Sequence, residues 1–198
     1  MAINQELFEF IFASTTTMLD SIKGDPSRLL SEADLQSRLF MSLSGAIESR
    51  PDHEQIALHS ELRFFASPEN QKKGIYPDLC ILDKDNILLC DSRVYTKGYV
   101  LRGSCIQIEL KLRRNNLGNA SPSRWCKDLK KLAGFRDFWS NSDQESGSTF
   151  FPLFVVYSHL LLHETEIETL ERQSQHNRIW SLACDSQQIR KITPHLLP

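Results

Sequence analysis

Residues 105–112 place two charged side chains on one side of a predicted strand. Apolar residues occupy every even position from 106 to 112, whereas Gln107, Glu109 and Lys111 occupy the odd positions between them. Because side chains alternate across a strand, the apolar side is expected to face the core. On an exposed face, Glu109 and Lys111 would form an ordinary surface pair that contributes little to stability. In a cleft, Glu109 is a metal ligand beside a cation that can hold a water or a phosphate.

A second carboxylate precedes another apolar stretch. Asp78 follows Pro77 and comes directly before Leu79 to Leu82, which predict a strand. If that strand neighbours residues 105–112, Asp78 and Glu109 converge at one edge of a sheet, where two carboxylates repel unless they share a cation. Oxygen ligands of this kind suit Mg²⁺ or Mn²⁺. Lys111 can then orient an attacking water or neutralise a phosphate.

The surrounding pattern predicts an α/β fold with a mixed central sheet flanked by helices. The predicted helices cover residues 4–20, 31–49, 123–139 and 164–173, and the predicted strands cover 56–66, 75–83, 87–90, 104–112, 151–157 and 179–184. Residues 75–83 and 87–90 are predicted to form a hairpin around a turn at 83–86. Ser31 is the expected cap of its helix, with Glu32 and Asp34 in the first turn.

Composition limits the class of protein. The chain has 198 residues, 40 % hydrophobic and 24 % charged, with a net charge of -2. This length predicts a single domain, 1–198, and the charge requires any nucleic-acid role to depend on a local basic surface. The five cysteines show no metal-binding spacing, and no apolar run is long enough for a bilayer. We therefore expect a reduced, cytoplasmic protein without a membrane partner.

Pro77-Asp78 followed by Glu109-Leu110-Lys111 resembles the PD-(D/E)xK nuclease superfamily. Residues 31–36 are similar to its first core helix and residues 125–132 to the helix after its ExK strand, so the likeness covers about 28–160. The remaining residues would be an N-terminal helix and a C-terminal helix–strand extension.

That resemblance implies a restriction-endonuclease-like topology and a Mg²⁺- or Mn²⁺-dependent nuclease. Asp78 and Glu109 would hold the metal, Lys111 would act in catalysis, and Glu32, in preference to Asp34, would add a further acid. The implied partner is nucleic acid, with DNA ahead of RNA although the sequence does not decide between them, and a homodimer is one implied assembly.

Other interpretations remain open from the sequence. An acid-x-Lys triplet is common, and a second one, Asp128 to Lys130, lies on a predicted helix, where positions i and i+2 do not share a face. Asp78 could be a turn residue, and Glu32 and Asp34 could serve only the helix dipole. The main alternative function is an inactive nuclease-like module that binds nucleic acid or protein, and a third is an unrelated α/β protein.

Basic residues follow the predicted site. The candidates for phosphate contacts are Arg113, Arg114, Arg124, Lys127, Lys130 and Lys131. Lys127, Lys130 and Lys131 fall on one side of the predicted helix, opposite Leu129 and Leu132, which suits a surface that follows a phosphate backbone or simply a solvated face. Tyr95 and Tyr99 suggest a second substrate loop with stacking groups.

Overall fold

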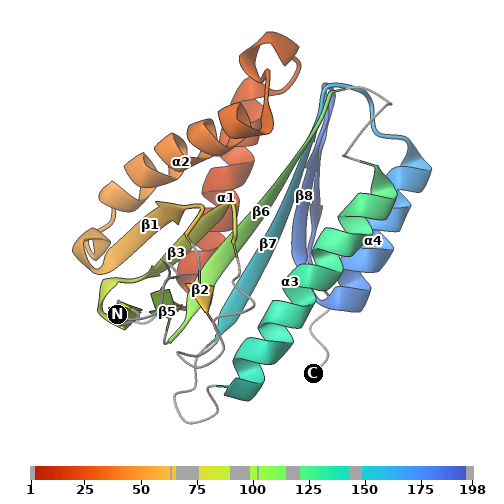
Figure 1. The fold of residues 1–198 in the computed structure, drawn as a ribbon. Coiled ribbons are helices and arrows are strands. Elements are labelled where there is room, and N and C mark those ends of the chain that lie inside the picture. Colours follow the sequence, from red (N-terminus) through yellow and green to blue (C-terminus); the bar gives the residue numbers. More distant parts are fainter. Residues whose placement is uncertain are drawn as a thin grey trace.

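The structure of the protein is a computed structural model (Figure 1). It describes residues 3–62, 64–65, 76–89, 99–101, 103–114, 121–142 and 149–194. The helices are α1 (Gln5–Ile22), α2 (Glu32–Glu48), α3 (Pro122–Ser142) and α4 (Glu164–Asn177). Short 3₁₀ turns cover Pro26–Arg28, His53–Gln55 and Lys84–Asn86. Within the described ranges, no helix is long and apolar enough to cross a membrane.

A six-stranded mixed sheet, in the order β1-β3-β6-β7-β8-β9, forms the centre of the molecule. Its strands are β1 (Ile56–Ser60), β3 (Leu79–Asp83), β6 (Cys105–Arg113), β7 (Phe150–Ser158), β8 (Trp180–Cys184) and β9 (Ile189–Ile192). β6, β7 and β8 run parallel, while β1, β3 and β9 pair antiparallel with their neighbours. The predicted mixed sheet with flanking helices is confirmed.

Helices cover both faces of this sheet (Figure 1). One core lies between the sheet and the pair α1 and α2, and contains the even-numbered apolar residues of β6. The other lies under α3 and α4 and includes Trp125, Leu129, Phe154 and Val156. β7 is buried at both faces, as its nearly continuous apolar sequence predicts.

The prediction of a helix at 31–49 that is capped by Ser31 is confirmed by α2. The Ser31 hydroxyl accepts a hydrogen bond from the Asp34 N–H at 3.1 Å, so Ser31 is the N-cap. Leu35, Leu39, Leu43 and Ile47 are buried along one side of this helix. The cap fixes where α2 begins and therefore where Glu32, its first residue, lies relative to the sheet.

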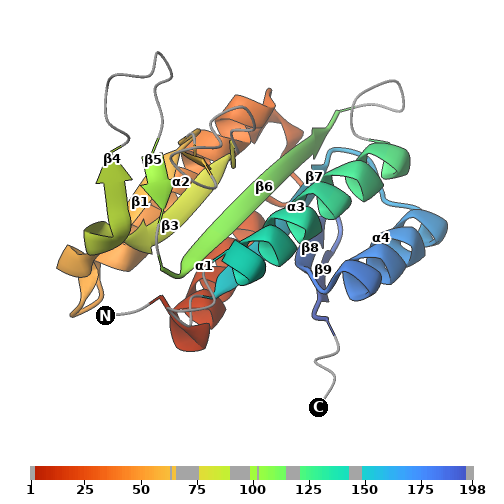
Figure 2. The same cartoon turned by 60° about the horizontal axis from the view of Figure 1, so that its bottom comes forward.

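Two predictions about strands were wrong, and one strand was missed. The predicted strand 56–66 divides, because Glu61 has a left-handed backbone with φ 51° that ends β1. The predicted hairpin does not form, because the turn at Lys84–Asn86 leads the chain away from the central sheet. Instead, β4 (Ile87–Leu89) joins β5 (Tyr99–Leu101) and β2 (Phe64–Phe65) in a second, three-stranded sheet. Figure 2 shows β4 and β5 of this sheet side by side. The edge strand β9 was not predicted.

Candidate active site

β6 continues beyond the end of its neighbour β3, and two carboxylates occupy the edge that this leaves. The pairing of β3 with β6 stops at Leu79 and Ile108. Beyond that point the Leu110 N–H donates to Asp78 Oδ2 at 2.6 Å, and the Leu112 N–H donates to Glu32 Oε2 at 3.2 Å. Amides two residues apart point to the same edge of a strand, so the two carboxylates replace the missing strand as acceptors.

The main chain of Asp78 is fixed by two further hydrogen bonds. Its carbonyl oxygen accepts from Gln36 Nε2 of α2 at 2.7 Å and from the Glu61 N–H at 3.1 Å. The left-handed turn at Glu61 thus has a local function, because it brings that amide to the residue before β3. Asp78 is held by β6, α2 and the end of β1 together, which is a rigid setting for one carboxylate.

Lys111 lies among three carboxylates. Its Nζ is 3.0 Å from Glu109 Oε1, 3.8 Å from Glu32 Oε1 and 3.8 Å from Asp128 Oδ2 of α3. The second oxygen of Glu109, Oε2, is 3.8 Å from Nζ of Lys131, also on α3. The structure therefore brings together Asp78, Glu109, Lys111 and Glu32, the four candidate catalytic residues, and adds two charged residues from α3.

Burial separates this cluster from an ordinary surface pair. The Glu109 side chain is only 8 % exposed and that of Lys111 is 15 % exposed, because α3 covers the polar side of β6. The alternative of a solvated Glu109–Lys111 pair is therefore wrong. The charges of Glu109 and Lys111 are instead removed from most of their water and interact strongly with their neighbours in the cluster.

Protonation in the cluster reflects this environment. Burial, together with repulsion from Glu109, raises the pKa of Asp78 to about 6, although the Leu110 amide and Lys111 act in the opposite direction. Burial opposes the charge of Lys111, but Glu109, Glu32 and Asp128 outweigh it, so the pKa of Lys111 lies above its ordinary value. Lys111 is therefore a cation at neutral pH and is not suited to act as a base.

Of the two acids in the first turn of α2, only Glu32 reaches the cluster. Asp34 Oδ2 accepts from the Leu30 N–H at 2.9 Å, and its amide is bound by Ser31, so Asp34 belongs to the start of the helix. The hydroxyl of Ser31, followed by the Leu30 amide, holds the pKa of Asp34 below its ordinary value. Glu32 instead spans from α2 to β6, where it contacts the Leu112 amide and Lys111.

The proposed phosphate-contact residues divide into two groups. Arg113 is buried and bound to Glu166 Oε2 at 2.7 Å, so its placement on a phosphate-binding surface is corrected: this guanidinium joins β6 to α4. Arg124, Lys127, Lys130 and Lys131 are exposed on α3. Arg114 is exposed beside the cluster and donates to the Leu30 carbonyl. Tyr95 lies outside the described residues, and Tyr99 is described only as part of β5.

Sequence reasoning missed Asp128 and Gln107. Asp128 was considered only as part of a triplet, yet it is one helical turn from Lys131, and the two residues share the face of α3 that meets β6. Gln107 is fully buried on the same side of β6 as Glu109, and neither its Nε2 nor its Oε1 has a hydrogen-bond partner among the residues that the structure describes. Helix periodicity was the available signal for Asp128, whereas burial of Gln107 depends on the tertiary structure.

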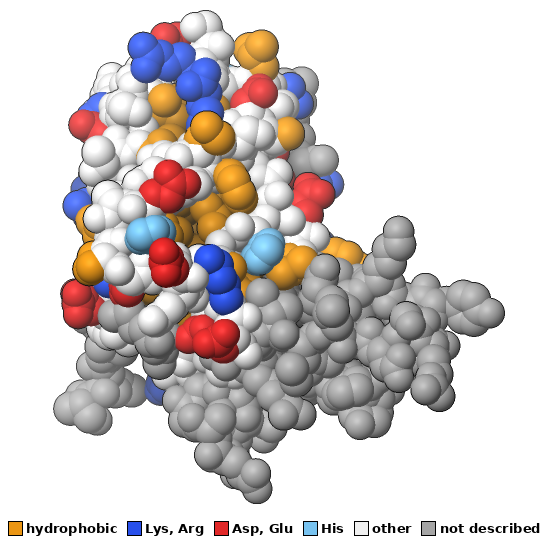
Figure 3. Space-filling model, turned by 90° about the vertical axis from the view of Figure 1, so that its left-hand side faces the viewer, with side chains coloured by type: hydrophobic (Ala, Val, Ile, Leu, Met, Phe, Trp, Pro, Cys, Tyr) orange, Lys and Arg blue, Asp and Glu red, His pale blue; other side chains and the backbone are white. Residues whose placement is uncertain are grey.

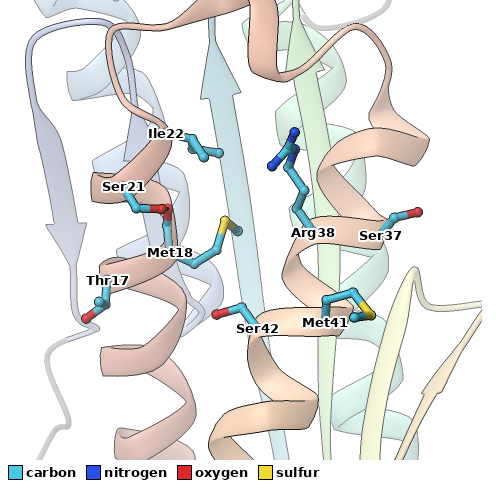
Figure 4. Close-up of a pocket in the computed structure, with 8 residues that line it drawn as sticks. All are labelled: Thr17, Met18, Ser21, Ile22, Ser37, Arg38, Met41 and Ser42. Atoms are coloured by element: carbon cyan, nitrogen blue, oxygen red, sulfur yellow. The ribbon is translucent and has the colours of Figure 1, made fainter.

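A separate concave region lies between α1 and α2, on the side of the molecule that Figure 3 shows. This cavity of about 480 Å³ is lined in part by Met18 and Ile22 of α1 and by Arg38, Met41 and Ser42 of α2 (Figure 4). Arg38 and Ser42 project from α2 into the space between the helices, as Met18 does from α1. The lining contains no carboxylate, histidine or cysteine, so this cavity is distinct from the acidic cluster.

The charges of the cluster suit one divalent cation. Four carboxylates, Asp78, Glu109, Glu32 and Asp128, meet two ammonium groups, which leaves two negative charges when all are ionised. In the part of the chain that the structure describes, no three Asp, Glu, His or Cys side chains form a ready metal cage. Mg²⁺ typically uses one or two carboxylates and keeps waters or substrate phosphates as its other ligands, so the pair Asp78 and Glu109 fits this ion.

Comparisons with known proteins do not assign this chain to a family. No protein-family model matches the chain, and no curated protein sequence matches it. The structure of NucC from P. aeruginosa ATCC27853 in its cAAA-bound form is similar, with a TM-score of 0.45 and 7 % sequence identity over 98 % of this chain and 86 % of NucC. At that similarity the comparison carries no information about activity.

Proposed function

We propose that this protein is a metal-dependent nuclease of the PD-(D/E)xK type that hydrolyses phosphodiester bonds in nucleic acid. The observation that supports this function best is the convergence of Asp78, Glu109, Glu32 and Lys111 at the end of β6 that extends beyond β3. The first two carboxylates lie close enough for Glu109 to raise the pKa of Asp78. This repulsion is what a shared cation would relieve.

In this proposal Asp78 and Glu109 hold Mg²⁺ or Mn²⁺, and Glu32 contributes through water or by holding the end of β6. The bound cation would polarise a phosphoryl oxygen and make an attacking water more acidic. Lys111, already cationic, stabilises the negative charge that develops on the phosphoryl group. Hydrolysis forms one P–O bond from water and breaks one P–O ester bond, which leaves a phosphate monoester and a free hydroxyl.

Nucleic acid is the proposed polymer because a basic surface adjoins the cluster. Arg124, Lys127 and Lys130 are exposed on the helix that also carries Asp128 and Lys131. Arg114 is also exposed, directly after β6. Such side chains bind phosphates without selecting a sequence. DNA is the first substrate to test and RNA the second, and a homodimer would allow cleavage of both strands.

A cleavage panel tests the function. Plasmid, linear duplex DNA, single-stranded DNA and RNA are incubated with the protein and Mg²⁺, Mn²⁺ or EDTA, beside Glu109→Gln, Lys111→Ala and the control Lys191→Ala. Lys191 is exposed on the distant edge strand β9, so its loss should leave cleavage unchanged. Metal-dependent cleavage lost in the first two variants supports a nuclease. Metal-insensitive binding without cleavage would support the inactive nucleic-acid-binding module instead.

A further inference from the structure

Both oxygens of Glu109 already have an ammonium group beside them. Lys111 of β6 lies at Oε1, and Lys131 of α3 lies 3.8 Å from Oε2. A cation held by Glu109, as the proposed function requires, would therefore weaken one of these two ion pairs. The lysine that leaves Glu109, Lys111 or Lys131, becomes free to bind another negatively charged group.

The two lysines are held very differently. Lys111 is 15 % exposed and has three carboxylates within 3.8 Å, so moving it would break several contacts. Lys131 is 42 % exposed, and its contacts within the described chain are Glu109 and the ring of Phe135, whose centroid is 5.8 Å away. A long side chain with one distant ion pair reorients at low cost. Lys131 is therefore the lysine that leaves Glu109.

We propose that Lys131 is a second active-site cation, which exchanges Glu109 for a non-bridging oxygen of the scissile phosphodiester. The inference rests on the proposed nuclease function. The exchange would conserve charge pairing: Glu109 would help to hold the metal, and Lys131 would turn from Glu109 to the phosphate. Its role thus differs from that of Lys127 and Lys130, which have no described contact with the carboxylate cluster.

Metal binding without substrate provides a readout independent of activity. Mn²⁺ is titrated by electron paramagnetic resonance into wild type, Lys131→Ala and the control Lys191→Ala. Removing a cation that competes for Glu109 should tighten Mn²⁺ binding about threefold or more in Lys131→Ala, because like charges at this separation repel even in a wet site. Lys191→Ala should bind Mn²⁺ as wild type does.

Kinetics then test the contact with phosphate. On the nucleic acid that wild type cleaves and on bis(4-nitrophenyl) phosphate, Lys131→Ala should lower kcat by about 10²-fold, as loss of one charge-stabilising donor typically does. KM should change by less than about threefold, since the contact matters most in the transition state. Lys131→Arg keeps the charge and should recover part of kcat, and Lys191→Ala should retain all of it.

These experiments distinguish failure of the role proposed for Lys131 from failure of the proposed nuclease function. If wild type cleaves and Lys131→Ala keeps its kcat while KM rises, Lys131 only tracks the backbone, and the inference is refuted although the nuclease function stands. Unchanged Mn²⁺ affinity in Lys131→Ala would also refute it. If wild type cleaves no phosphodiester with either metal, the proposed function fails, and the inference fails with it.

Discussion

Replacing Asp78 by asparagine should stabilise the metal-free protein at neutral pH. Asparagine has nearly the same shape and retains an oxygen that can accept from the Leu110 N–H, the bond now made at 2.6 Å. It removes the negative charge that burial and Glu109 disfavour. The substitution therefore isolates the electrostatic cost of one carboxylate while keeping its hydrogen bond.

The magnitude follows from the raised pKa. An unfolded aspartate ionises near its ordinary pKa of 3.8, whereas the pKa of Asp78 in the fold is about 6. Between these values the native state binds more protons than the unfolded state, so wild type loses stability as the pH rises. A difference of about two pKa units corresponds to about 3 kcal/mol. The unfolding free energy of Asp78→Asn relative to wild type should therefore increase by about 2 kcal/mol as the pH rises from about 4.5 to about 8.

Urea unfolding of both proteins in EDTA, at several pH values, measures this gain. Asp52→Asn is a matched control, in which the same substitution should lower the unfolding free energy at neutral pH. Arg50 binds Asp52 at 2.9 and 3.1 Å and holds its pKa below the ordinary value. The stability from Asp52 is present above its unfolded pKa and is lost in acid, so Asp52→Asn should cost most at neutral pH. A stability difference between Asp78→Asn and wild type that does not change with pH would refute the electrostatic account of the site.

Four further predictions address the same region. Lys111→Ala should cleave about 10²-fold more slowly with little loss of nucleic-acid binding, and cleavage within about threefold of wild type would remove Lys111 from the mechanism. If the site binds Mg²⁺ with Kd on the order of 1 mM, about 10 mM metal should stabilise wild type by roughly 1.4 kcal/mol and raise Tm by about 3–6 °C, and Glu109→Gln should lose this shift in a calorimetric scan. Lys127→Ala and Lys130→Ala should each flatten the log–log salt dependence of DNA binding by about 0.7–0.9, and unchanged slopes would favour a solvated helix face. Gln107→Met should raise the unfolding free energy by about 1–3 kcal/mol, because it removes a buried amide that has no hydrogen-bond partner within the described ranges, and a lower urea midpoint would show that this amide is paired in solution.

The sequence predicted the elements around the cluster well where local pattern and topology agree. Alternation in residues 105–112 located β6 and the shared side of Glu109 and Lys111, and the cap at Ser31 located Glu32. The pattern failed for β3 and β4, because a turn sequence shows that the chain changes direction and not which strand it joins next. Burial of Gln107 and Glu109 was also beyond sequence reasoning, since it depends on α3 packing across a polar strand face.

The choice of acids at the end of β6 argues for a function beyond holding the strand. The N–H groups of Leu110 and Leu112 need acceptors, and neutral amides at positions 78 and 32 would provide them. At Asp78, a neutral acceptor would avoid an electrostatic cost of about 3 kcal/mol at neutral pH. A cost of that size is a large fraction of the net stability of a typical domain. An amide could make the same hydrogen bond as the Asp78 carboxylate without the repulsion from Glu109. A requirement for negative charge at this position would explain the carboxylate, and the cation of the proposed function would meet that requirement.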